Sequence, residues 1–103
     1  MDRINKLKEL ITKSPGDNFL QHALALEYIK IGEDKSAQPL FEEILHRNPG
    51  YVGSYYHLAK LLARNGDREH AINWYERGME EAKKAGDQHA LNELRAAYEE
   101  LMY

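Results

Sequence analysis

Residues 24–41 read LALEYIKIGEDKSAQPLF, and residues 58–75, which lie 34 positions later, read LAKLLARNGDREHAINWY. Each stretch opens with Leu-Ala, continues to a glycine and closes with an Ala-x3-aromatic unit. The pairs that match across this interval are Leu24 and Leu58, Ala25 and Ala59, Gly32 and Gly66, Ala37 and Ala71, and Pro15 and Pro49. A period of 34 residues is typical of repeats in which a helix, a turn and a second helix form one unit. The sequence therefore predicts an all-α, helix-turn-helix solenoid.

The same frame extends to both ends of the sequence. Apolar residues at helical spacing are Ile4, Leu7, Leu10 and Ile11 near the start, and Leu91, Leu94, Tyr98 and Leu101 near the end. We expect six helices packed as sequential antiparallel pairs, at about 2–13, 18–31, 35–47, 52–64, 68–85 and 88–102. Residues 1–103 are expected to form a single domain. Its parts are an N-terminal half repeat at 2–15, full repeats at 18–51 and 52–85, and a C-terminal capping helix at 88–102.

The residues within each repeat identify a family. The first unit reads Gln21-x2-Leu24-Ala25-x2-Tyr28, then Gly32, Ala37-x3-Phe41 and Pro49, and the second reads Tyr55-x2-Leu58-Ala59-x2-Leu62, then Gly66 and Ala71-x3-Tyr75. This pattern resembles the tetratricopeptide repeat, with two full repeats flanked by half-repeat helices. The departures are Gln21 in the Trp position, Leu62 in the Tyr position and Lys83 in the Pro position. None of them opposes a helix.

Pro39 is one local feature that conflicts with the expected third helix. A helix that begins at Lys35 would crowd the proline ring against an upstream carbonyl, and proline cannot donate a backbone hydrogen bond. We therefore expect the regular helix to begin nearer Ser36, or to bend there.

Composition limits the classes of function. The 103 residues include no cysteine, and the net charge is −3 with acidic and basic residues interspersed. This charge does not favour nucleic acid as a partner. No apolar run approaches the roughly 20 residues of a membrane span. We expect a cytoplasmic protein that does not interact with membranes.

No residues form a recognisable catalytic motif. The serines Ser14, Ser36 and Ser54 lie in no Gly-x-Ser-x-Gly element, and no glycine spacing fits a phosphate-binding loop. No two of the five histidines are one helical turn apart, although His22, His57 and His89 are expected on one face. We predict that the protein is not an enzyme and has neither a cofactor nor a metal site.

The resemblance implies a function in protein binding. In tetratricopeptide repeat proteins the first helices of successive repeats line a concave groove that holds a peptide or a helix of a partner. The corresponding residues here are Phe19, His22, Leu26, Ile29, Lys30, Tyr56, His57, Lys60 and Arg64. Large apolar side chains beside cations favour a partner segment that combines acidic residues with apolar anchors. We therefore expect a scaffold or adaptor.

One known function of the family is not expected here, and one alternative function remains. Chaperone adaptors of this family clamp a C-terminal carboxylate with two Lys, two Asn and an Arg. The corresponding residues here are His22, Leu26, His57, His89 and Glu93, so we do not expect a receptor for chaperone tails. The alternative to a groove-binding adaptor is a self-associating assembly module, in which the apolar end helices pair in a homodimer.

Overall fold

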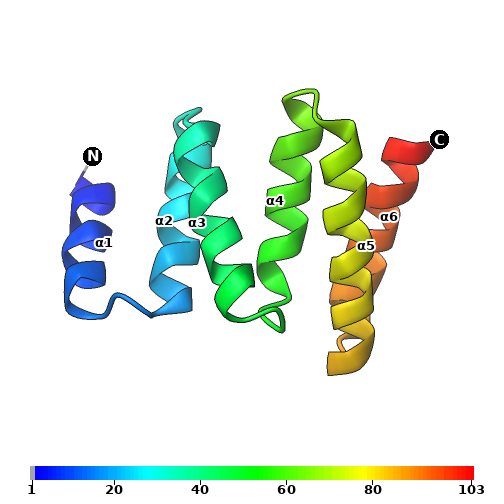
Figure 1. Cartoon of the computed structure of the whole chain (residues 1–103). Coiled ribbons are helices and arrows are strands. Elements are labelled where there is room, and N and C mark those ends of the chain that lie inside the picture. Colours follow the sequence, from blue (N-terminus) through cyan, green and yellow to red (C-terminus); the bar gives the residue numbers. More distant parts are fainter. Residues whose placement is uncertain (1) are drawn as a thin grey trace. The chain divides into compact units, whose positions relative to one another are not determined.

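The computed structural model describes residues 2–103, with the side chains described from residue 3 onward. Within this range the chain forms six α-helices and no strand (Figure 1). They are α1 (Asp2–Lys13), α2 (Asn18–Lys30), α3 (Asp34–Arg47), α4 (Gly53–Arg64), α5 (Arg68–Ala85) and α6 (Gln88–Met102). The predicted all-α class and the six predicted helices are confirmed. Their bounds differ from the prediction by at most one residue.

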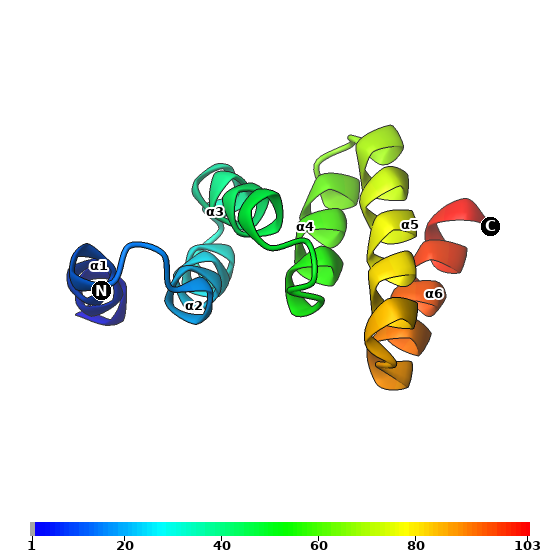
Figure 2. The same cartoon turned by 60° about the horizontal axis from the view of Figure 1, so that its bottom comes forward.

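The helices divide into two compact units, Met1–Arg47 and Asn48–Tyr103. In the first unit, α2 packs against both α1 and α3, and in the second unit α4, α5 and α6 all contact one another. Consecutive helices within each unit run in opposite directions, which Figures 1 and 2 show from two sides. The helices α4 and α6 therefore run the same way, with α5 packed against both.

Glycine and aspartate determine where the helices end and begin. Gly32 and Gly66, which follow the first helix of each repeat, have φ angles of 79° and 88°. This left-handed conformation costs glycine little, because it has no Cβ. Asp67 then caps the next helix, since its carboxylate accepts a hydrogen bond from the backbone N–H of His70. The turn thus contains its own stop and start signals.

Of the two alternatives expected from Pro39, a helix start nearer Ser36 is wrong, because α3 begins at Asp34 with Pro39 inside it. Proline at this position removes one bond, to the carbonyl of Lys35, in the exposed first turn of the helix. Water can hydrogen-bond that carbonyl, because both Lys35 and Pro39 are exposed. The local cost is therefore small enough for the helix to continue through the proline.

The small residues of the repeated pattern are buried in the core. The four alanines of the repeated pattern are 0% exposed: Ala25, Ala37, Ala59 and Ala71. The large apolar residues between them, such as Leu24, Leu58 and Phe41, are also buried. This confirms the frame that the 34-residue period predicted, because small residues allow two helix backbones to approach and large residues fill the remaining space.

The side chain at the first large position of each repeat donates a hydrogen bond to the linker that precedes the repeat. In the second repeat the hydroxyl of Tyr55 donates to the carbonyl oxygen of Pro49, at 2.6 Å. In the first repeat Gln21 occupies the same position, and its Nε2 donates to the carbonyl oxygen of Pro15, at 3.2 Å. Gln21 also accepts a hydrogen bond from Arg47 at the end of α3, at 2.7 Å. Both residues therefore perform the same linker contact although one is aromatic and the other is an amide.

Gly78 lies at the point where α5 meets both of its neighbours. A Cβ atom at this position would be 2.6 Å from the Cβ and 2.9 Å from the Cγ of Tyr55 on α4, and 3.2 Å from the Cδ1 of Leu94 on α6. These distances are shorter than van der Waals contact. A glycine in mid-helix costs about 1 kcal/mol relative to alanine, and here that cost permits the three helices to pack closely.

We predict that Tyr55→Phe destabilises the protein by about 1 to 2 kcal/mol, because it leaves the Pro49 carbonyl without its hydrogen-bond donor. Urea unfolding followed by circular dichroism measures this difference. Tyr103→Phe is the control, since Tyr103 is 97% exposed. Equal stability of the two variants would show that the linker contact contributes nothing.

We also predict that Gly78→Ala lowers the free energy of unfolding by up to about 2 kcal/mol. The gain in helix propensity of roughly 1 kcal/mol is smaller than the cost of overpacking, about 1 to 3 kcal/mol. The same substitution at Gly53, where a Cβ meets no atom within 4 Å, is the control. A more stable Gly78→Ala variant would contradict the close contact at this glycine.

Candidate partner-binding site

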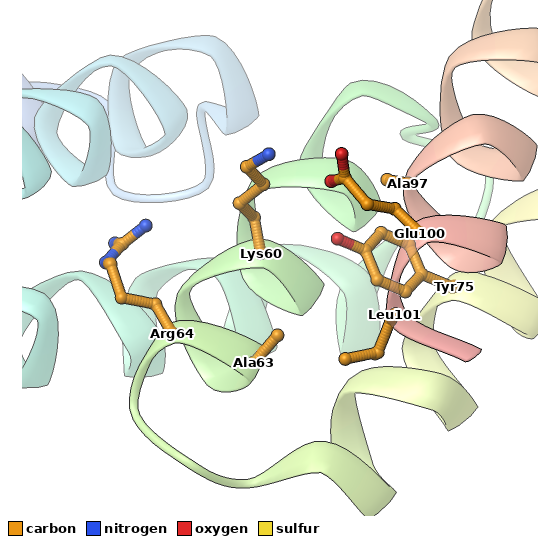
Figure 3. A pocket seen from close by; sticks show the side chains of 7 residues that line it. All are labelled: Lys60, Ala63, Arg64, Tyr75, Ala97, Glu100 and Leu101. Carbon is orange, nitrogen blue, oxygen red and sulfur yellow. The ribbon is translucent and has the colours of Figure 1, made fainter. Parts of the chain in front are cut away.

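The second unit has a surface pocket of about 320 Å³ between α4 and α6, with its floor on α5 (Figure 3). Its lining residues are Lys60, Ala63 and Arg64 from α4, Tyr75 from α5, and Ala97, Glu100 and Leu101 from α6. Alanine and leucine side chains form apolar walls, while the polar groups come from the longer side chains. Most of the pocket is thus apolar, with a few polar groups that can orient a bound group.

A second pocket of about 280 Å³ adjoins the first. It is lined by Tyr56, Lys60, Glu93, Ala96, Ala97 and Glu100, three of which also line the first pocket. We call the residues of the two pockets together the α4–α6 furrow. The furrow follows the first helix of the second repeat and the helix that occupies the equivalent place after it.

The two long walls of the furrow carry opposite charges. Lys60 and Arg64 lie on α4, whereas Glu93 and Glu100 lie on α6. Figure 3 shows the amine of Lys60 and the carboxylate of Glu100 projecting from opposite walls toward the same side. Within residues 3–103, Lys60 forms no ion pair, and its Nζ lies 5.6 Å from the centroid of the Tyr56 ring, a cation–π distance. Both walls can therefore offer charge to a ligand.

Of the predicted residues in this unit, Tyr56, Lys60 and Arg64 line the furrow and His57 does not. The ring of His57 is half-buried and meets Tyr56 edge-on, with centroids 5.4 Å apart. Burial lowers the pKa of His57 below its ordinary value of 6.5, and the negative charge of Glu93 only partly opposes this shift. His57 therefore resembles a packing residue more than a ligand contact.

The predicted residues in the first unit lie on α2 and differ in their surroundings. Phe19 is 70% exposed, and Leu26 and Ile29 are half-buried. The ring of His22 meets the buried Phe41 edge-on, at 5.5 Å between centroids. These three apolar side chains can contact a partner, whereas His22 also packs against the core.

Lys30, the last predicted residue on α2, is not a free cation. Its Nζ lies 3.4 Å from the Oε2 of Glu27, and the same oxygen accepts a hydrogen bond from the Nε of Arg3, at 3.0 Å. Burial acts to raise the pKa of Glu27, but the hydrogen bond from Arg3 and the charge of Lys30 outweigh it, so the pKa lies below the ordinary value. The positive charge that Lys30 presents to a ligand is therefore reduced.

Sequence reasoning missed Tyr75, Ala97 and Leu101 as lining residues of the furrow. Tyr75 occupies the second-helix position of Phe41, where the repeat pattern predicts a core aromatic. The difference between a phenyl and a phenol at equivalent positions was the available signal. Ala97 and Leu101 gave no comparable signal, because their exposure depends on how α6 packs against α4.

The described side chains, those of residues 3–103, include no metal cluster that sequence reasoning overlooked. No three His, Asp or Glu side chains of this range are grouped so that they could hold a metal ion. The same range has no helix that is both long and apolar enough to cross a bilayer.

We predict that His57 makes the protein less stable as the pH falls below about 6.5. The unfolded chain binds a proton there more readily than the folded chain, whose His57 pKa is lowered, so stability declines from pH 6.5 down to the folded pKa. His57→Gln should reduce this decline, as measured by urea unfolding between pH 7 and 5. His89→Gln, at an exposed position, is the control. An unchanged pH dependence in His57→Gln would show that His57 is not the source of the loss of stability at low pH.

Comparison with known proteins agrees with this geometry. A model of the tetratricopeptide repeat family matches residues 32–98. The crystal structure of a tetratricopeptide repeat domain protein from Salinibacter ruber is 41% identical, with 84% of this chain and 96% of that chain covered and a TM-score of 0.81. Protein BPP2914 from Bordetella parapertussis, solved in solution, is 25% identical, with 96% and 86% covered and a TM-score of 0.83.

One similar protein is much longer than this chain, and only a short part of it matches. The tetratricopeptide repeat and J domain-containing co-chaperone DNJ1 of Cryptococcus neoformans var. grubii is 42% identical over 50 residues, which are 48% of this chain and 9% of that protein. The chain thus matches a small part of that relative. The family match covers well over half of the sequence, and the similar structures have the all-α solenoid fold that the period predicted. This chain belongs to the tetratricopeptide repeat family.

Proposed function

We propose that this protein binds a peptide or helical segment of a partner protein, with the α4–α6 furrow as the main contact. The observation that carries the proposal is the pair of adjoining pockets, which share Lys60, Ala97 and Glu100 and have apolar walls between charged rims. Proteins of this fold generally act as interaction modules rather than as enzymes. The proposed role is that of a non-catalytic adaptor in the cytoplasm.

The exposed side chains favour a partner segment with apolar anchors and acidic residues. Tyr56 and the alanine walls offer apolar contact, and Lys60 and Arg64 offer positive charge. Glu93 and Glu100 on the opposite wall disfavour a segment that is acidic along its whole length. The acidic residues of the partner should therefore lie beside α4.

Similarity to a co-chaperone supports a protein as the partner, but does not indicate which part of the partner is bound. Glu93 would repel a C-terminal carboxylate in the second pocket. We therefore propose an internal segment of the partner rather than its C-terminus.

The alternative function is self-association. It is favoured by two exposed residues on the end helices, since Leu10 is 37% and Tyr103 is 97% exposed. Size-exclusion chromatography with light scattering separates the two functions. An adaptor elutes as a monomer at all concentrations, whereas an assembly module shows a dimer that Leu10→Asp or Tyr103→Asp disrupts.

We predict that Tyr56→Ala weakens ligand binding by about 1 to 2 kcal/mol, because anchoring aromatic residues carry much of the affinity at interfaces. Lys60→Ala should act mainly at low ionic strength, since exposed charges are screened by salt. Peptides selected from a displayed random 16-residue library on the immobilised protein serve as probes, and calorimetry measures their affinity.

The controls for this prediction are Tyr103→Ala and Lys84→Ala, which change the same residue types outside the furrow. Selected peptides should shift the NMR signals of furrow residues. Signals that shift only on the end helices, together with equal effects of Tyr56→Ala and Tyr103→Ala, would favour self-association over the groove.

A further inference from the structure

Tyr75 is a buried residue whose hydroxyl is not required for packing. Its side chain is 2% exposed on α5. The equivalent position in the first repeat, 34 residues earlier, is Phe41, which is 0% exposed and has no hydroxyl. The same protein thus fills this core position with a phenyl ring in one repeat and with a phenol in the other. The hydroxyl needs a separate explanation.

The hydroxyl of Tyr75 opens onto the larger pocket of the furrow. Figure 3 shows it directed into the space between Lys60 and Glu100. No residue in the range 3–103 forms a hydrogen bond with it. Tyr55 is different, because its buried hydroxyl donates to a backbone carbonyl within the same unit. No buried side-chain N or O atom of residues 3–103 lacks a hydrogen-bond partner, so the Tyr75 oxygen is one that solvent or a ligand reaches through the pocket.

The protonation state of this hydroxyl is fixed near neutral pH. Burial, followed by the neighbouring Tyr56 and Glu100, raises the pKa of Tyr75 to about 12. The group therefore keeps its proton and can donate a hydrogen bond. Lys60 is a second donor at the same pocket, whereas Glu100 can only accept.

This combination of donors and an acceptor limits the chemistry of the bound group. A carboxylate beside the Tyr75 hydroxyl would be attracted by Lys60 and Arg64 but repelled by Glu100. For an ammonium or guanidinium the attraction and the repulsion are reversed, so neither charge is favoured by both walls. A neutral amide avoids both repulsions. Its carbonyl can accept from a donor on one side while its N–H donates to the carboxylate on the other.

We propose that the pocket receives an amide group of the partner, with the Tyr75 hydroxyl donating to the amide carbonyl and Glu100 accepting from the amide N–H. This inference rests on the proposed function of the furrow. The amide belongs either to an Asn or Gln side chain or to a peptide group of the partner's backbone. The apolar walls, formed by Ala63, Ala97 and Leu101, pack against the carbon atoms beside the amide.

Tyr75→Phe tests the proposal, because it removes one oxygen and reproduces the residue that the first repeat already uses. Its urea unfolding midpoint should equal that of the unchanged protein, since no internal hydrogen bond is lost. Its affinity for the peptides selected on the unchanged protein should be roughly 2- to 10-fold lower, the range expected for one hydrogen bond. Tyr55→Phe is the matched control, with a lowered midpoint and little change in affinity.

Peptide variants then identify the source of the amide. If the amide is a side chain, replacing one Asn or Gln of the peptide by Ala removes the difference in peptide affinity between the unchanged protein and Tyr75→Phe. If it is a peptide group, that difference persists in peptides without Asn or Gln and disappears when one backbone nitrogen is methylated. Either result supports the amide.

Two results would overturn the proposal. The first is equal affinity of Tyr75→Phe and the unchanged protein for peptides that shift the furrow signals, which would leave groove binding intact. The second is tighter binding when the critical Asn or Gln becomes Glu, which would make the ligand group a carboxylate. If no selected peptide shifts the furrow signals, the proposed function fails and this inference fails with it.

Discussion

Close approach of helices at small residues is the constraint on which the rest of the structure depends. Four alanines, Ala25, Ala37, Ala59 and Ala71, are fully buried, one on each helix of the two repeats. Larger side chains at these positions would separate the backbones and open the layer of Leu and aromatic residues between them. The 34-residue period in the sequence reflects this contact, because the same close approach of helices recurs once in each repeat.

Gly78 extends this constraint from a pair of helices to three. Since even a Cβ atom would collide with Tyr55 on α4 and touch Leu94 on α6, the spacing of all three helices depends on one residue. The α4–α6 furrow lies between two of these helices and has Tyr75 of the third at its floor. The dimensions of the candidate site are therefore a consequence of core packing. Glycine in mid-helix carries a backbone entropy cost, and the close packing at Gly78 requires it.

The linker contacts show how the repeat tolerates changes in residue type. Gln21 and Tyr55 differ in size and chemistry, but each donates a hydrogen bond to the carbonyl of the proline six residues earlier. The shorter amide is supported by Arg47, which also bonds to Asn18 at the start of α2. Either a phenol or an amide at this position can reach the proline carbonyl and donate a hydrogen bond to it.

The sequence by itself determined the helices, their turns and the core positions, because these follow from local backbone preferences and from one repeated interval. Its error at Pro39 came from weighing the proline by itself, whereas an exposed first turn loses little when one bond is missing. Tertiary structure alone decided which surface groups remain available to bind a partner. The pairing of Arg3 on α1 with Glu27 on α2 and the opening of the Tyr75 hydroxyl onto a pocket both depend on side chains from neighbouring helices. No periodicity within one helix contains that information, because distances between side chains on different helices are fixed only when the helices pack.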